Sequence, residues 1–151
     1  MAEHQQYVTL GVADEVFAAP VGKVQEILDV QPIARLPQAP ANLLGMIDVR
    51  GQGVPVLDLR LTLGMEAKAD SENTRIVVLA IGGAGGERLL GLRTDRVFEV
   101  TVLDADELDP PPAVSGSWAG HCIAGIGRRN GRFVTVLDLD RLLGEQGALA
   151  A

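Results

Sequence analysis

The chain has 151 residues, of which 47% are hydrophobic and only 3% aromatic, and its formal net charge is −7. This length and apolar content indicate one folded domain, or two small lobes, with a core built from Val, Leu and Ile. The acidic charge disfavours nucleic acid and anionic membranes as partners, and the single cysteine excludes an intrachain disulfide.

The first half of the chain shows short apolar runs separated by turn residues, a pattern typical of β-strands. We expect strands at Tyr7–Val12, Glu15–Ala19, Val24–Val30 and Val54–Leu57. A further apolar run begins at Gly45, and Arg50 lies between it and a Gly-Gln-Gly turn. One helical turn should follow the last strand, with Asp58 as its N-cap and Gly64 just past its end. The polar residues 65–74 predict a linker.

The second half repeats this alternation of apolar runs and turns. We expect strands at Arg75–Ile81, Arg88–Arg93, Val97–Val102, Ile123–Arg128 and Phe133–Leu137. The glycine-rich run 82–86 predicts a hairpin tip, and Asn130-Gly131 predicts a two-residue turn because both residues tolerate positive φ. A second and longer helix is expected over 138–145, with Asp138 as its N-cap and Gly144 as its C′ residue.

An internal repeat is the strongest signal in the sequence. Val54–Gly64 and Val134–Gly144 are identical at seven of eleven positions, at an offset of 80. Lys23–Ile27 resembles Arg96–Val100 at an offset of 73. The chain therefore reads as two copies, residues 6–64 and 75–144. A copy of this size buries little core alone, so we expect two small β lobes that pack against each other.

The residues give no constellation for catalysis, a cofactor or a metal ion. The only histidines are His4 and His121, and an extended backbone would point His121 and its neighbour Cys122 to opposite faces. The glycines at 82–86 lack the Lys-Ser/Thr of a phosphate-binding loop. A small β-barrel enzyme or ligand-binding domain would need a converging polar pocket, and a structural oligomer subunit stays open as an alternative.

The sequence also lacks a secretory leader and any stretch of about 18 apolar residues, so we expect a cytoplasmic protein that does not insert into a membrane. Arg50 is the most informative charged residue. Its guanidinium is either solvated or an anchor for a partner's carboxylate or carbonyl group. Lys23, Glu26 and Arg60 are ambiguous in the same way.

Several segments, in their order and spacing, resemble the CheW family of chemotaxis coupling proteins. They are Lys23–Ile27, Ile33–Pro37, Leu44–Gly51, Val54–Arg60, Gly91–Asp95 and Ile123–Gly127. The resemblance covers residues 6–144 and implies a single domain of two SH3-like, five-stranded β-barrel lobes. These lobes would share a hydrophobic core, and a short C-terminal helix would follow.

The resemblance also implies a non-enzymatic adaptor that couples a CheA-type histidine kinase to methyl-accepting chemotaxis receptors in arrays at the inner membrane. An adaptor of a non-flagellar chemosensory pathway, such as pilus or developmental control, is the alternative. The implied receptor-binding residues are Val21, Val24, Glu26, Ile27, Arg50 and Val100. The implied kinase-binding residues, on exposed strand edges and loops, are Gly45, Val54 and Val56.

Overall fold

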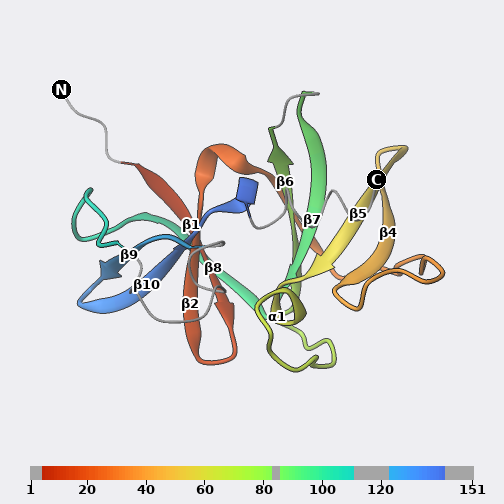
Figure 1. The fold of residues 1–151 in the computed structure, drawn as a ribbon, viewed down its shortest axis with the longest axis horizontal. Coiled ribbons are helices and arrows are strands. Elements are labelled where there is room, and N and C mark those ends of the chain that lie inside the picture. Colours follow the sequence, from red (N-terminus) through yellow and green to blue (C-terminus); the bar gives the residue numbers. More distant parts are fainter. Residues whose placement is uncertain (1–4, 83–85, 111–122, 142–151) are drawn as a thin grey trace.

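A computed structural model describes residues 5–82, 86–110 and 123–141 (Figure 1). Besides the start of a second helix at residues 139–141, the described residues form ten strands, the α-helical turn α1 and one 3₁₀ turn. In chain order these are β1 (Gln6–Val12), β2 (Glu15–Pro20), η1 (Val21–Lys23), β3 (Val24–Asp29), β4 (Leu43–Val49), β5 (Gln52–Asp58), α1 (Leu59–Thr62), β6 (Arg75–Ile81), β7 (Arg88–Thr94), β8 (Arg96–Val102), β9 (Ile123–Arg129) and β10 (Arg132–Leu137).

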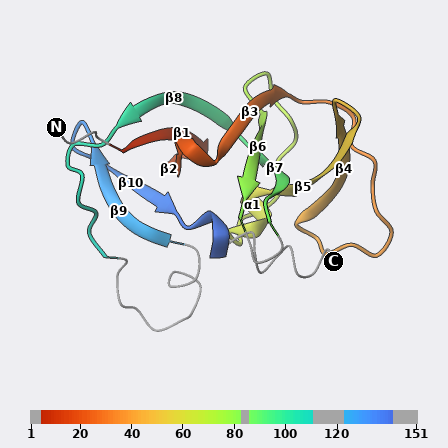
Figure 2. The same cartoon turned by 90° about the horizontal axis from the view of Figure 1, so that it is seen from above.

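The strands form two five-stranded sheets that lie side by side (Figures 1 and 2). The order in the first sheet is β8-β1-β2-β10-β9, and the order in the second is β3-β6-β7-β5-β4. Most neighbours are antiparallel, but β10 runs parallel to β2, and β5 runs parallel to β7. The expected all-β class with two five-stranded lobes is confirmed.

The two sheets do not coincide with the two sequence copies, 6–64 and 75–144. Strands β1 and β2 of the first copy join β8, β9 and β10 of the second, while β3, β4 and β5 join β6 and β7. The two orders are related by counting five strands forward along the chain and continuing from β10 to β1. In this way β8-β1-β2-β10-β9 becomes β3-β6-β7-β5-β4. The repeat is therefore real, but each sheet is completed by strands from the other copy. Residue similarity shows which strands are alike, and cannot show which copy they pair with.

A central hydrophobic cluster joins the two sheets. It combines side chains from both, and its members are Val8, Leu10, Val12, Phe17, Ala19, Leu43, Leu57, Leu59, Val77, Leu79, Ile81, Leu90, Leu92, Leu137 and Leu139. Each sheet buries a smaller cluster on its other face, around Val134 and Val136 in the first and around Val54 and Val56 in the second. These two valine pairs are equivalent in the repeat, and the expected shared core is confirmed.

The helix caps follow the expected turn chemistry. The Asp58 carboxylate accepts a hydrogen bond from the Arg60 backbone N–H at 2.9 Å. Gly64 has φ of +82° and donates to the Leu61 carbonyl, while Met65 donates to the Arg60 carbonyl, which closes the turn.

The second capping site is equivalent. The Asp138 carboxylate accepts from the Arg141 backbone N–H at 3.1 Å, and residues 139–141 are helical. The remainder of the expected helix over 138–145, with Gly144, lies outside the described residues.

Residues 65–74, the predicted linker, form an irregular connection from α1 to β6, and a buried arginine fixes it to the second sheet. Arg93 on β7 donates to the Asp70 carboxylate at 2.7 Å and to the Lys68 carbonyl at 2.8 Å. Its Nη1 also lies 3.3 Å from the buried Asp58 carboxylate. The linker is therefore held against the sheet by charged hydrogen bonds, which are stronger than neutral ones.

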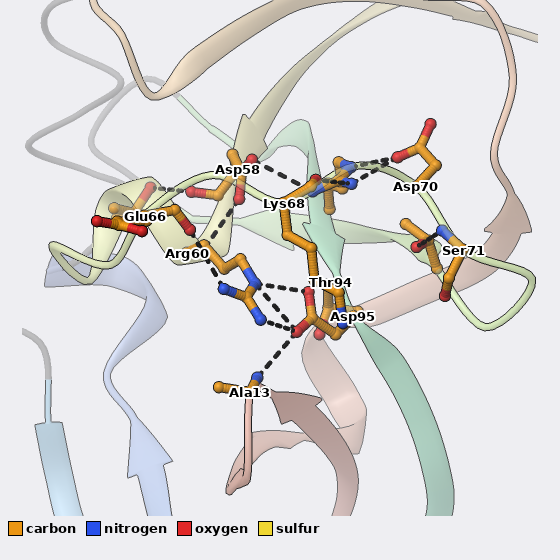
Figure 3. A network of polar contacts seen from close by, with 12 residues as sticks. Ala13, Asp58, Arg60, Glu66, Lys68, Asp70, Ser71, Thr94 and Asp95 are labelled. Carbon is orange, nitrogen blue, oxygen red and sulfur yellow. Dashed lines mark hydrogen bonds and ion pairs between the residues drawn. The ribbon is translucent and has the colours of Figure 1, made fainter.

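A second arginine connects the two sheets (Figure 3). Arg60 on α1 pairs with Asp95, in the turn from β7 to β8, at 2.7 Å. The Asp95 carboxylate also accepts from the Ala13 backbone N–H, in the turn between β1 and β2, at 2.8 Å. The hydrogen bond from Arg60 is the main reason that the pKa of Asp95 lies below its usual value.

Candidate functional site: a protein-docking surface

Two edge strands, β3 and β8, lie along the same side of the molecule (Figure 2). Each has one sheet neighbour, β6 for β3 and β1 for β8, so each leaves one edge unpaired. The two strands are equivalent in the repeat. Exposed strand edges are natural places for a partner to dock, and they carry most of the predicted receptor-binding residues.

A β-bulge sets the direction of the side chains on β3. The register against β6 shifts between Val24 and Glu26. Val24 then opposes the buried Leu79, and Ile27 opposes the buried Val77. Residues three apart would point to opposite faces of a regular strand, so the bulge is what aligns the two side chains with the central cluster.

The equivalent bulge occurs on β8. The register against β1 shifts between Val8 and Leu10, so Val97 opposes Leu10 and Val100 opposes Val8. Both partners are buried members of the central cluster. The intervening Phe98 and Glu99 are exposed.

These two strands, with η1 before β3, extend the central cluster to the surface as an apolar strip made of Val21, Val24, Ile27, Val97 and Val100. Ile27 is 42% exposed and Val100 is 53% exposed. The other three are partly buried and pack against the central cluster. Exposed aliphatic residues grouped beside a core are typical of protein interaction sites. The family resemblance implied all of these residues except Val97, whose equivalence to Val24 at the offset of 73 was the available signal.

A charged pair flanks this strip. The Arg50 guanidinium makes two hydrogen bonds with the Glu26 carboxylate, at 2.7 and 3.1 Å. Arg50 lies in the turn between β4 and β5, and its side chain is 76% exposed. The predicted residues Glu26 and Arg50 are therefore in contact.

The backbone of Arg50 is in the left-handed region, with φ of +51°, and Gly51 follows with φ of +83°. This turn geometry favours Asn-Gly, the pair that stands at the equivalent positions Asn130 and Gly131. An arginine in this conformation is disfavoured by about 1–2 kcal/mol. An exposed ion pair contributes only about 0–1 kcal/mol, so the turn alone does not require arginine here.

The predicted kinase-binding residues need a correction. Val54 and Val56 are 0% exposed and belong to the outer cluster of the second sheet. Gly45 is also buried, with φ of +146°, and a Cβ added to it would lie 2.1 Å from the Ala34 carbonyl oxygen. These residues cannot form a contact surface in this structure. Val54 and Val56 are buried because β5 lies inside the sheet between β7 and β4, and Gly45 on β4 is buried because the Ala34 backbone packs against it.

The outer edge of β4 is the accessible feature nearest to these residues. Ala34, in the connection before β4, exchanges two backbone hydrogen bonds of 2.8 Å with Met46. The backbone N–H and C=O groups of successive residues point alternately to the two edges of a strand. Those of Asp48, two residues after Met46, therefore point to the same outer edge of β4. This part of the edge lies beside the turn that carries Arg50.

The described residues include no group of three or more His, Cys, Asp or Glu that could hold a metal ion. They also include no helix long and apolar enough to cross a membrane. His4, His121 and Cys122 lie outside the described residues.

Comparisons with known proteins agree with this architecture. The chemotaxis protein CheW of Klebsiella aerogenes is 28% identical over 142 residues, which cover 94% of this chain and 83% of that protein. Protein FrzA of Myxococcus xanthus is 26% identical, over 92% of this chain and 85% of its own length. The crystal structure of the scaffolding protein TtCheW from Thermoanaerobacter tengcongensis superposes with a TM-score of 0.81 and 26% identity, over 93% and 92% of the two chains. A family model described as the CheW-like domain matches residues 6–147, so the protein belongs to the CheW-like domain family.

Proposed function

We propose that this protein is a non-enzymatic adaptor that couples a CheA-type histidine kinase to methyl-accepting chemotaxis receptors in the cytoplasm, at arrays on the inner membrane. The observation that carries the proposal is the apolar strip with the Glu26–Arg50 pair beside it. The names of the relatives, a chemotaxis protein and a scaffolding protein, support a binding role.

The apolar strip suits the helical tip of a receptor hairpin. An amphipathic helix laid on this surface would cover Ile27 and Val100, and fully burying an aliphatic side chain of this size contributes about 1.5–3 kcal/mol. Arg50 would determine register, because a guanidinium has five N–H donors and its two hydrogen bonds to Glu26 leave others for a partner.

For the kinase, we propose the open part of the β4 edge beyond Met46. A strand or loop of the kinase regulatory domain could there extend the second sheet through backbone hydrogen bonds. In this proposal the predicted kinase-binding residues act indirectly, because they support the conformation of β4 from within the sheet. These residues are Gly45, Val54 and Val56. The receptor and kinase surfaces then meet near Arg50, which suits the transfer of small movements through packed contacts.

The same surfaces would also serve an adaptor of a non-flagellar chemosensory pathway. They specify the kinds of partner, a receptor tip and a kinase domain, and not the cellular output. The similarity to FrzA shows that the relatives include proteins whose names do not mention chemotaxis.

The test is kinase activation in a reconstituted array of receptor, adaptor and kinase. Arg50→Glu should keep the fold and abolish most of the receptor-dependent activation, because it places a carboxylate beside Glu26 and removes the anchor. Arg88→Glu, an exposed position at the start of β7, makes the same charge change and should leave activation unaltered. Full activation by Arg50→Glu would contradict the proposed role.

A further inference from the structure

The hairpin of β9 and β10 is the structural duplicate of the hairpin of β4 and β5. Asn130 and Gly131 have φ of +54° and +80°, close to the +51° and +83° of Arg50 and Gly51. Both hairpins join edge strands to their sheets. Each also pairs with a bulged edge strand through an arginine, Arg129 with Glu99 on β8 and Arg50 with Glu26 on β3.

The side chains of the two hairpins differ sharply in charge. Copy one carries Asp48, Val49, Gln52 and Gly53 around its turn, and copy two carries Arg128, Arg129, Arg132 and Phe133 at the equivalent positions. Since the first hairpin forms the same backbone without these residues, the fold does not require three arginines here. They are also unusual in a chain whose net charge is −7.

Exposed phenylalanines accompany these arginines. Phe98 on β8 is 48% exposed and Phe133 on β10 is 66% exposed. The Arg96 guanidinium lies 5.5 Å from the Phe98 ring centre, and Arg128 lies 5.0 Å from the Phe133 ring centre. Arginine and aromatic side chains are the residue types enriched at the centres of protein interfaces.

A cavity of about 210 Å³ lies between β8 and this hairpin, and its lining includes Phe98, Glu99, Arg129 and Arg132. Arg129 and Arg132 are directly opposed in the ladder, an arrangement of like charges that is unfavourable unless an anion lies between them. The buried Nε of Arg129 has no hydrogen-bond acceptor, and the nearest carboxylate oxygen, on Glu99, is 3.8 Å away. The cavity therefore has donors without enough acceptors.

We propose that this arginine face, made of Arg96, Phe98, Arg129 and Arg132, docks an acidic segment of a partner protein. A carboxylate in the cavity would supply the missing acceptor between Arg129 and Arg132, and apolar groups beside it would cover Phe98. A protein segment fits better than an anionic membrane, because the cavity accepts single carboxylates while the acidic chain repels an extended negative surface. The inference does not depend on the receptor or kinase contacts proposed above.

A fluorescein-labelled peptide of about ten residues, rich in glutamate and with two leucines, is a suitable probe, with glutamine replacing glutamate in the control peptide. Fluorescence anisotropy should show binding of the glutamate peptide only. The double variant Arg129→Glu/Arg132→Glu should weaken binding at least about tenfold. The control Arg35→Glu/Arg88→Glu changes the net charge equally at exposed positions outside the face, and should bind like the unaltered protein.

A third variant gives an effect of opposite sign. Glu99→Gln removes the internal carboxylate that competes for Arg129, so it should tighten peptide binding severalfold. The proposal would be overturned by no binding at about 1 mM peptide, by equal losses in the two double variants, or by unchanged binding of the glutamine peptide. Binding to phosphatidylserine vesicles without binding to the peptide would also overturn it.

Discussion

The substitution Arg50→Asn separates the stability of the protein from its proposed function. It gives copy one the residue type that copy two has at the equivalent position, Asn130. The backbone needs little change, because φ is +51° at Arg50 and +54° at Asn130. Asparagine tolerates this left-handed conformation, and it removes the two hydrogen bonds to Glu26. The change should therefore relieve backbone strain and delete the charged anchor at once.

The two effects on the free energy of unfolding oppose each other. Relief of the left-handed arginine is favourable by about 1–2 kcal/mol. Loss of the ion pair costs about 0–1 kcal/mol, at the lower end because the Arg50 side chain is 76% exposed. The net expectation is a protein that is about 0–2 kcal/mol more stable, and each kcal/mol corresponds to a Tm higher by about 2–4 °C at this chain length.

Urea unfolding followed by circular dichroism measures this balance, and receptor-dependent kinase activation measures the function. We expect Arg50→Asn to keep or raise the free energy of unfolding and to lose activation. A loss of stability greater than about 1 kcal/mol would refute the reasoning, because the Glu26 pair would then be a structural requirement of the fold. Gly51→Ala is a useful comparison, since alanine at its φ of +83° should destabilise the same turn.

Three further predictions concern the buried framework. Gly45→Ala should lower the free energy of unfolding in urea by more than about 3 kcal/mol, because its Cβ would lie 2.1 Å from a backbone carbonyl oxygen, and near-native stability would contradict this packing. Arg93→Met should cost about 3–5 kcal/mol in the same assay by leaving the buried Asp58 carboxylate without its cationic partner, and adding Asp58→Asn should recover part of the loss. Asp95→Asn should reduce stability at pH 7 and flatten the acid side of the pH–stability curve. The pKa of Asp95 is depressed below its ordinary 3.8 in the folded state, so its contribution is present above that value and is lost as the pH falls through the folded-state pKa. An unchanged acid limb in the variant would contradict the pairing with Arg60.

The sequence predicted the element types well because the strands are short, strongly apolar and separated by specific turn residues. The caps at Asp58 and Asp138 and the turn at Asn130-Gly131 depend on local backbone chemistry, so local residues were sufficient to identify them. The pairing of strands between copies could not be predicted, because both copies present equally apolar strands to either partner.

The candidate site was only partly predictable for a related reason. Alternation along a regular strand would have placed Val97 and Val100 on opposite faces, and the bulge that aligns them has no clear residue signature. Val54 and Val56 were assigned to the surface through the family resemblance, whereas β5 is an interior strand. The linker also appeared to be a simple polar connection, because nothing in residues 65–74 indicates the buried Arg93 that binds it.

The most direct test of the adaptor proposal is calorimetric binding of the purified protein to a receptor hairpin-tip fragment, with and without the regulatory domain of the kinase. We expect both partners to bind together, and Val100→Asp to abolish receptor binding while leaving kinase binding and the circular dichroism spectrum intact. Leu36→Asp, which also introduces a carboxylate at an exposed apolar residue, should change none of these. Receptor binding that survives Val100→Asp, or two partners that exclude each other, would contradict the docking surface described for β3 and β8.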